Sequence, residues 1–147
     1  MHIRFASLDD IKKLAENNVQ LALESEGINI EYENTFKGVK EVIGDKSKGF
    51  YLVAEENEEI IGQLMVTYEW SDWRAKQIWW LQSIYVRKEW RRKGVMKALI
   101  EKVKNMAMKE GVAALRLYVH KENRNAIKAY EKVGMRKASY LIYETKL

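Results

Sequence analysis

The residues with the clearest potential for chemistry form a basic segment near the middle of the chain. Residues 87–94 read RKEWRRKG, and an apolar pattern of helical spacing begins directly after them. Most helices begin with a Ser, Thr, Asp or Asn cap and acidic residues, because their free N–H groups and dipole favour negative charge. Here Arg91, Arg92, Lys93 and Lys97 surround the expected start instead. This arrangement favours an anion-binding site, and the alternative is a loop whose charges are solvated.

Gly94 makes this segment suitable for binding a phosphate. A glycine between a strand and a helix allows a tight turn that directs several backbone N–H groups at one phosphate. The chain has neither a Walker-type glycine-rich loop nor the three-glycine dinucleotide fingerprint. Nucleotide hydrolysis and nicotinamide chemistry are therefore disfavoured.

The composition argues against several other classes of protein. The 147 residues include no cysteine, which excludes disulfides, thiol nucleophiles and thiolate metal sites. Only two histidines occur, His2 and His120, which are too few for a dedicated zinc site, so we expect no metal. A Ser-His-Asp hydrolase is disfavoured because His2 lies beside the amino terminus. The net charge of +5 permits an acidic partner without requiring one.

The spacing of apolar residues predicts the elements that position the basic segment. Ser7 and Asp10 have the spacing of a capping box ahead of the first helix. Residues 56–59 lie between two strand patterns and predict a hairpin turn. The pattern predicts strands over residues 2–6, 50–55, 60–70, 77–86, 112–119 and 137–146, and helices over 11–24, 35–43, 95–109 and 123–133.

The order of these elements predicts one mixed α/β domain. The unit from Gln77 through the long helix to Val119 is a βαβ crossover, which requires two parallel neighbouring strands. We find no internal repeat, no low-complexity tract and no linker long enough to separate domains. We therefore expect a single domain over residues 1–147.

Two motifs resemble those of the GNAT superfamily of acyl-CoA N-acyltransferases. Residues 91–96, RRKGVM, are similar to the family's pyrophosphate-binding loop, in which Gln or Arg is followed by two residues, Gly, one residue, and Gly or Ala. Met96 departs from that last position. The resemblance implies the GNAT fold, a single mixed sheet with a βαβ cofactor-binding core, over nearly the whole chain. The second motif lies at matching spacing in the helix after the next strand and comprises Asn123, Ala126, Ile127, Tyr130 and Gly134.

The resemblance implies acetyl-CoA as co-substrate and a role for each matching residue. Backbone N–H groups from Arg92 to Lys97 would hold the pyrophosphate. The backbone of Ile84 to Val86 would pair with the pantetheine arm like an added strand, because the arm carries amide groups. Asn123 would contact the pantetheine or thiol, and its alternative role is a plain helix cap. The implied cofactor-binding residues are Ile84, Tyr85, Val86, Arg91, Arg92, Lys93, Gly94, Val95, Met96, Lys97 and Asn123.

Tyr130 is the catalytic residue that the resemblance implies. A phenol with a pKa near ~10 can protonate a leaving thiolate whose conjugate acid, if like cysteine, has a pKa near ~8.5. The alternative is packing, because Tyr130 shares one helical face with apolar neighbours. The strand positions where relatives carry a basic carboxylate hold Gln82, Ser83 and Tyr118, which are poor bases. A water chain, Glu69 or Asp72 remains as the route for the proton.

Acidic and aromatic residues are candidates for the acceptor site. The connection between the first two helices carries no Lys or Arg among its glutamates, so it would favour a cationic amine or form a solvated loop. Trp79 and Trp80 are adjacent on one strand, so they must face opposite sides of the sheet. Tryptophans near this strand could line a pocket or a dimer interface. The residues in question are Glu24, Glu26, Glu31 and Glu33, and Trp70, Trp73, Trp79 and Trp80.

We expect an N-acetyltransferase that moves the acetyl group directly to a primary amine of a small molecule, peptide or protein. One alternative is an acyl-CoA-binding protein without catalysis. Another is a basic nucleic-acid-binding module, which is disfavoured because the cations occupy one short loop. No apolar run approaches the ~20 residues of a membrane span, and the start MHIRF lacks a signal-peptide pattern. We therefore expect a cytoplasmic protein that binds neither membrane nor nucleic acid, with a homodimer as an option because relatives are often dimers.

Overall fold

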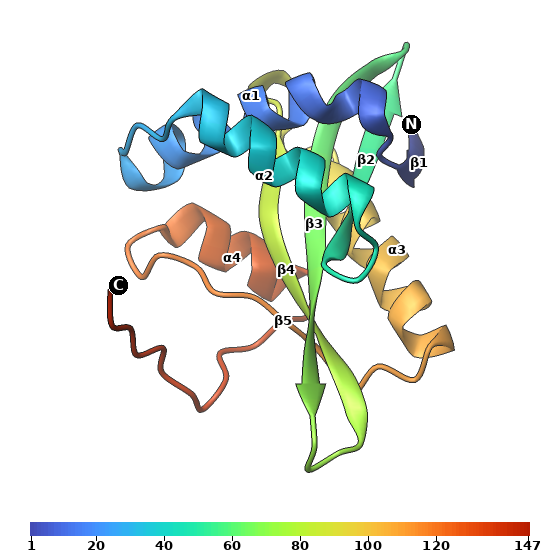
Figure 1. The fold of residues 1–147 in the computed structure, drawn as a ribbon, viewed down its shortest axis with the longest axis vertical. Helices are drawn as coiled ribbons and strands as arrows, with labels where there is room; N and C mark the ends of the chain where they lie inside the picture. Colours follow the sequence, from blue (N-terminus) through green and yellow to red (C-terminus); the bar gives the residue numbers. More distant parts are fainter.

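One five-stranded sheet forms the centre of the molecule (Figure 1). The computed structural model describes all residues from 1 to 147. Neighbouring strands are antiparallel from β1 to β4, whereas β4 and β5 are parallel, which confirms the predicted βαβ crossover. The strands follow the chain order across the sheet and are β1 (His2–Phe5), β2 (Gly49–Glu56), β3 (Glu59–Ser71), β4 (Lys76–Val86) and β5 (Ala114–Arg116).

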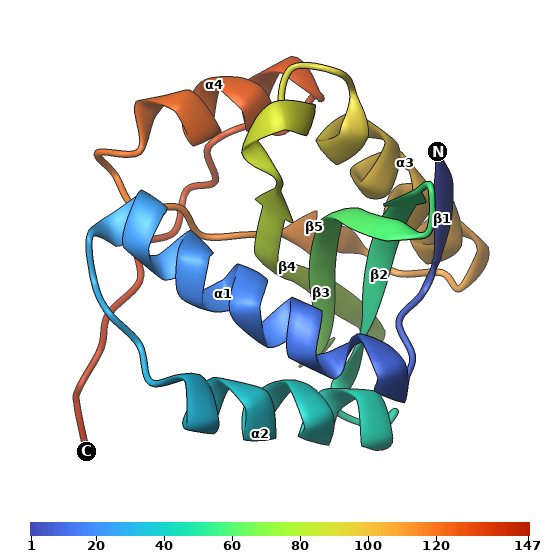
Figure 2. The same cartoon turned by 90° about the horizontal axis from the view of Figure 1, so that it is seen from above.

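Helices cover both faces of the sheet (Figure 2). One core cluster joins the sheet to α1 and α2, and a second joins the opposite face to α3. Tyr130 and Val133 of the α4 region pack against the α3 cluster. None of these helices combines the length and the apolar character that a membrane crossing needs. The helices are α1 (Ile11–Glu26), α2 (Tyr32–Gly44), α3 (Val95–Lys109) and α4 (Arg124–Lys132), with short 3-10 turns η1 (Leu8–Asp10) and η2 (Lys88–Trp90).

The alternating side chains of β2 explain the two core clusters. Leu52 and Ala54 face α3, while Tyr51 and Val53 face α1 and α2. On β3, Gly62 allows α3 to approach the sheet closely. A Cβ atom at Gly62 would lie 2.7 Å from Val95 Cγ1, so a side chain there would displace the first turn of α3.

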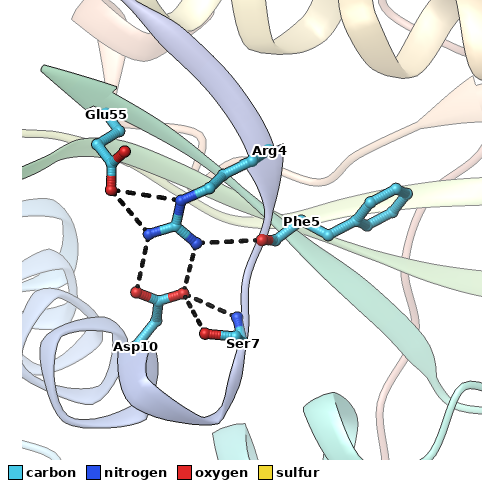
Figure 3. Close-up of polar contacts among 5 residues, drawn as sticks. All are labelled: Arg4, Phe5, Ser7, Asp10 and Glu55. Carbon is cyan, nitrogen blue, oxygen red and sulfur yellow. Dashed lines mark hydrogen bonds and ion pairs between the residues drawn. The ribbon is translucent and has the colours of Figure 1, made fainter. Parts of the chain in front are cut away.

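A network of charges fixes the amino-terminal corner, where β1 passes into α1 (Figure 3). The Arg4 guanidinium donates two hydrogen bonds to the Asp10 carboxylate, at 2.7 and 3.1 Å, and also bonds to Glu55 Oε2 at 2.9 Å. The Ser7 backbone N–H donates to Asp10 Oδ2 at 2.8 Å, as the predicted capping box requires. The hydrogen bonds from Arg4 hold the pKa of the Asp10 carboxyl below its usual value.

Most predicted elements are confirmed, including the hairpin between β2 and β3 and the bounds of α3. The second helix begins at Tyr32, three residues before the predicted start. The strand predicted over residues 112–119 forms only as β5. The closing strand predicted over residues 137–146 is wrong, because those residues pair with no strand (Figure 1). Leu141 and Tyr143 supply the alternation of a strand, but both side chains are exposed and bury no apolar face.

Candidate functional site

The first turn of α3 has an unusual excess of unpaired N–H donors. Gly94 occupies the N-cap position with a φ of 83°, a left-handed conformation that favours glycine, and no side chain caps the helix. None of the six amide groups from Arg92 to Lys97 donates to a loop or cap carbonyl, and the first that does is Ala98, to Gly94 O at 3.0 Å. The opening N–H groups of a helix have no acceptor within the helix. The structure therefore leaves these N–H groups unpaired, and anion binding by this turn stays a prediction.

Two of the cations near this turn are neutralised by acidic side chains. Arg91 Nη2 donates to Glu24 Oε1 of α1 at 2.7 Å, and its Nε donates to the Val86 carbonyl at 2.9 Å. Arg87 forms ion pairs with Glu59 and Glu89. The guanidinium of Arg91 thus anchors the loop to α1 and β4.

The other basic side chains of the segment form no ion pair with the protein. The Lys93 ammonium lies 5.2 Å from the centre of the Trp90 ring. Arg92 and Lys97 are exposed and have no acidic partner. These three residues belong to the same segment as the unpaired N–H groups, and no acidic side chain neutralises them.

The Tyr85 side chain faces α1. It is 8% exposed, and its hydroxyl donates to Glu24 Oε2 at 2.9 Å. Burial, together with that hydrogen bond, raises the pKa of Tyr85 to about 12. Burial opposes ionisation of Glu24, but the hydrogen bonds from Arg91 and Tyr85 outweigh it and lower the pKa of this carboxyl. Only the backbone of Tyr85 is left for the predicted contact with pantetheine.

The carboxyl-terminal half of β4 is an open sheet edge on the side of β5. The two strands pair only from Ile78 to Trp80, opposite Ala114 to Arg116, whereas β4 continues to Val86. A bulge interrupts β4 in this half, because the register shifts by one residue and Ser83 has a φ of 50°. The unpaired edge can bond an extended ligand that carries amide groups.

A cavity of about 500 Å³ lies beside this edge of the sheet. Its walls come from the end of α1, the bulged part of β4, the segment after β5 and α4. Three of the predicted site residues line it, namely Ile84, Asn123 and Tyr130. The structure therefore brings the second motif to the open edge of β4.

Asn123 and Tyr130 have distinct environments on α4. The Asn123 side chain accepts a hydrogen bond from the Ala126 N–H at 3.3 Å, so it is a helix cap that also lines the cavity. Burial raises the pKa of the Tyr130 phenol. Tyr130 is therefore protonated throughout the neutral pH range, as a general acid must be.

The two carboxylates proposed as alternative bases do not line the cavity. Glu69 accepts a hydrogen bond from Trp80 Nε1 at 2.8 Å and lies 3.8 Å from Arg116. Asp72 caps the turn between β3 and β4, where it accepts from the Trp73 N–H at 3.0 Å. The weakly basic residues Gln82, Ser83 and Tyr118 do line the cavity, as do Glu26 and His120.

Of the acidic and tryptophan residues predicted for the acceptor site, only one lines the cavity. Of the four glutamates near the end of α1, only Glu26 lines the cavity. Trp79 is buried and Trp80 is half-buried, with the latter near Tyr118 on the other face of β4, as predicted. The exposed residues Trp70 and Trp73 do not line the cavity, and Trp73 is 91% exposed.

Sequence reasoning missed two residues that the structure places at the site. His120 lines the cavity, and its Nδ1 accepts from the Glu122 N–H at 3.2 Å, which leaves the other nitrogen to carry the proton of the neutral ring. Gln63 is fully buried behind the β4 bulge. In the sequence, Gln63 could have been noticed as the one amide side chain within the apolar run of β3.

Comparisons with known proteins agree with this geometry. The model of the acetyltransferase (GNAT) family matches residues 16–135. The crystal structure of a possible acetyltransferase from Clostridium difficile 630 superimposes with a TM-score of 0.93 at 42% identity, covering 99% of this chain and 97% of that one. A predicted acetyltransferase from Clostridium acetobutylicum, solved with acetyl-CoA, is only 16% identical and shares the fold, with a TM-score of 0.80 over 98% of this chain and 95% of that one.

Two curated relatives have named acceptors. The thialysine N-epsilon-acetyltransferase of Bos taurus is 32% identical over 75 residues, which are 51% of this chain and 44% of that protein. The L-ornithine N5-acetyltransferase NATA1 of Arabidopsis thaliana is 30% identical over 93 residues, which are 63% of this chain and 41% of that protein. The match to this chain thus spans less than half the length of either curated relative.

Proposed function

Because the chain belongs to the GNAT acetyltransferase family, we propose that it transfers an acetyl group from acetyl-CoA directly to a primary amine. The observation that carries this proposal is the group of unpaired N–H donors from Arg92 to Lys97, around a left-handed Gly94. It lies within the part of the chain that the family model matches.

The first turn of α3 binds the pyrophosphate of acetyl-CoA in this proposal. The unpaired N–H groups donate to the phosphate oxygens, and the helix dipole adds to the attraction. The side chains of Arg92, Lys93 and Lys97 supply positive charge around them. Val95 and Met96 contribute backbone N–H groups, while their side chains pack into the core beside α3.

The pantetheine arm lies along the open edge of β4 in this proposal. Amide groups of the arm pair with the backbone from Ile84 to Val86, in the manner of an added strand. Asn123 lies across the same cavity and contacts the arm or the thioester end. The acetyl group is thereby brought near Tyr130.

The chemical step is a direct attack of the neutral amine on the thioester carbonyl carbon. The C–N bond forms, the C–S bond breaks, and Tyr130 gives its proton to the departing sulfur. An acyl-enzyme on cysteine is excluded because the chain has no cysteine. The amine gives up its own proton through a water chain, since neither Glu69 nor Asp72 lines the cavity.

A primary amine of a small molecule is the acceptor that the relatives favour most, with an amine of a peptide or protein as the wider class. The names of the bovine and Arabidopsis relatives both specify the side-chain amino group of a small amino acid. Glu26 lines the cavity and would attract such a cation before it loses its proton.

The decisive test is thiol release from acetyl-CoA over a panel of amines, with the wild type compared with Tyr130→Phe. We expect kcat to fall ~100-fold in the variant, because the leaving thiolate loses its proton donor. The Kd for acetyl-CoA should not change. Full turnover of the variant from about pH 6 to 9 would remove Tyr130 from the mechanism.

The same assay tests a non-catalytic acyl-CoA-binding protein, which the absence of Glu69 and Asp72 from the cavity lining favours. Such a protein would bind acetyl-CoA and release no thiol with any amine. The internal ion pairs of Arg87 and Arg91 oppose a nucleic-acid-binding module, because they leave fewer free cations for phosphate contacts.

A further inference from the structure

Gln63 on β3 is the centre of a buried network of amide side chains. Its Oε1 accepts from Asn17 Nδ2 at 2.9 Å, and its Nε2 donates to Asn18 Oδ1 at 2.8 Å and to the Ser83 carbonyl at 3.2 Å. Asn18 Nδ2 in turn donates to the Tyr51 hydroxyl at 3.1 Å. No buried side-chain N or O atom in the protein lacks a partner. The network is fully satisfied, so its geometry is well defined.

Ser83, which this network contacts, is the residue at which β4 leaves regular pairing. Gln63 pairs with Tyr85 while Met65 pairs with Gln82, so β4 contains one residue more than β3 between these pairs. The φ of 50° at Ser83 is unfavourable for a residue with a Cβ. The hydrogen bond from Gln63 holds the carbonyl of this strained residue.

Loss of the bulge would alter the whole cofactor edge of β4. A shift of one residue turns every side chain of a strand to the opposite face. Tyr85 would then leave Glu24, and Ile84 would leave the cavity that it lines. The backbone groups between Ile84 and Val86 would reverse their direction as well.

We propose that Gln63 is a positioning residue for acetyl-CoA: its amide holds the Ser83 carbonyl and keeps the backbone of Ile84–Val86 directed at the cofactor cavity. This inference rests on the proposed function. Burying an amide in an apolar strand carries a desolvation cost that an aliphatic side chain would avoid. Core packing alone therefore does not explain a glutamine between Ile61 and Leu64, which are both buried.

The test measures acetyl-CoA affinity for Gln63→Met, alone and combined with Ser83→Gly. Methionine keeps the volume and removes the hydrogen bonds, so we expect the Kd to rise about tenfold in the single variant. Glycine adopts a positive φ without strain. In a chain that carries Ser83→Gly, the same Gln63→Met change should therefore alter the Kd by less than about twofold.

Gln77→Met is the matched control on β4. Gln77 accepts the hydrogen bond of the buried Trp79 indole at 3.0 Å, far from the bulge. Its loss should lower the melting temperature without a change in Kd. If Gln63→Met does not fold, Asn17→Ala replaces it, because it removes the donor that orients the Gln63 amide. We expect a smaller rise in Kd, again suppressed by Ser83→Gly.

The other possible results contradict either the positioning role of Gln63 or the proposed function. An unchanged Kd in Gln63→Met, or a tenfold loss that persists with Ser83→Gly, would contradict the positioning role while leaving the proposed function intact. A wild-type chain that shows no heat of acetyl-CoA binding in calorimetry would contradict the proposed function itself.

Discussion

The amino-terminal corner and the start of α3 solve the same problem in opposite ways. In both places a strand passes into a helical segment whose first N–H groups need acceptors. At the corner, Asp10 accepts from the Ser7 N–H and from Arg4, so protein groups satisfy the donors and the charge (Figure 3). At α3, neither a cap nor an acidic residue is present, and cations surround the unpaired donors.

The difference separates residues that stabilise the fold from residues to which the proposed function gives a role in binding acetyl-CoA. A capped and charge-paired turn contributes to the free energy of folding. An uncapped turn with positive charge forgoes that contribution and keeps its donors for an anion. We therefore expect substitutions at the two turns to affect different measurements, stability at the corner and acetyl-CoA affinity at α3.

The largest expected effect is that of Asp10→Ala. Removal of the carboxylate leaves Arg4 without its closest partner and the Ser7 N–H without an acceptor, so the free energy of unfolding should fall by about 2–3 kcal/mol. Urea denaturation measures this loss. Asp9→Ala is the matched control, because Asp9 is exposed and should change stability by less than ~0.5 kcal/mol. A change in acetyl-CoA affinity in Asp10→Ala would break the contrast between the two turns.

Gly94→Val should weaken acetyl-CoA binding about tenfold, because a β-branched residue resists the positive φ that directs the N–H groups. The cause is backbone strain, since a Cβ at Gly94 meets no atom within 4 Å. Gly27→Val is the control: Gly27 also has a positive φ and open space around it, but it caps α1. Calorimetry should show reduced affinity only for Gly94→Val, and equal affinities would contradict the assigned loop.

Lys97→Glu should change stability and affinity in opposite directions. An acid in the first turn of α3 favours the helix dipole, so the free protein should gain about 0.5 kcal/mol. The same carboxylate repels a pyrophosphate, so the Kd for acetyl-CoA should rise several-fold. Lys104→Glu, in the middle of the same helix, should do neither. A Lys97→Glu variant that binds acetyl-CoA more tightly would refute the anion site.

The smallest expected effect is a pH dependence at the corner. The pKa of Asp10 is lowered in the folded state from its ordinary 3.8, first by the hydrogen bonds from Arg4. Its contribution to stability is therefore complete above 3.8 and is lost as the pH falls through the lowered pKa of the folded state. In acid titrations of unfolding, Asp10→Asn should lose less stability than the wild type over this range, and parallel curves would contradict the pairing.

The start of α3 was predictable from sequence because its signals are local. Residues 91–97 show the missing cap, the cations and Gly94 together, and the predicted bounds of α3 are those of the structure. The capping box at Ser7 is equally local. The partner of Arg91 was not predictable, because Glu24 lies 67 residues away along the chain.

Long-range partners also explain the other differences. The odd amide of Gln63 is visible in the sequence, but its partner Asn17 lies 46 residues away. The alternation at Leu141 and Tyr143 predicts a strand from local information, whereas a strand also needs a neighbour to pair with. Tyr130 was predictable only through its motif, because an aromatic residue on an apolar helical face is equally suited to packing.

The contact between Gly62 of β3 and Val95 of α3 also fixes the distance between this helix and the sheet. If the pantetheine arm of acetyl-CoA lies extended along β4, as proposed, the distance from its diphosphate to its sulfur is set, and the protein must hold two distant subsites at a matching separation. In the proposed function, one subsite begins at Val95 and the other lies along β4, whose Val86 pairs with Gly62. Because a hydrogen atom stands where a methyl group would collide, helix and sheet meet at one defined spacing. Gly62 therefore sets the distance between α3 and the sheet, and in the proposed function this distance matches the length of the ligand.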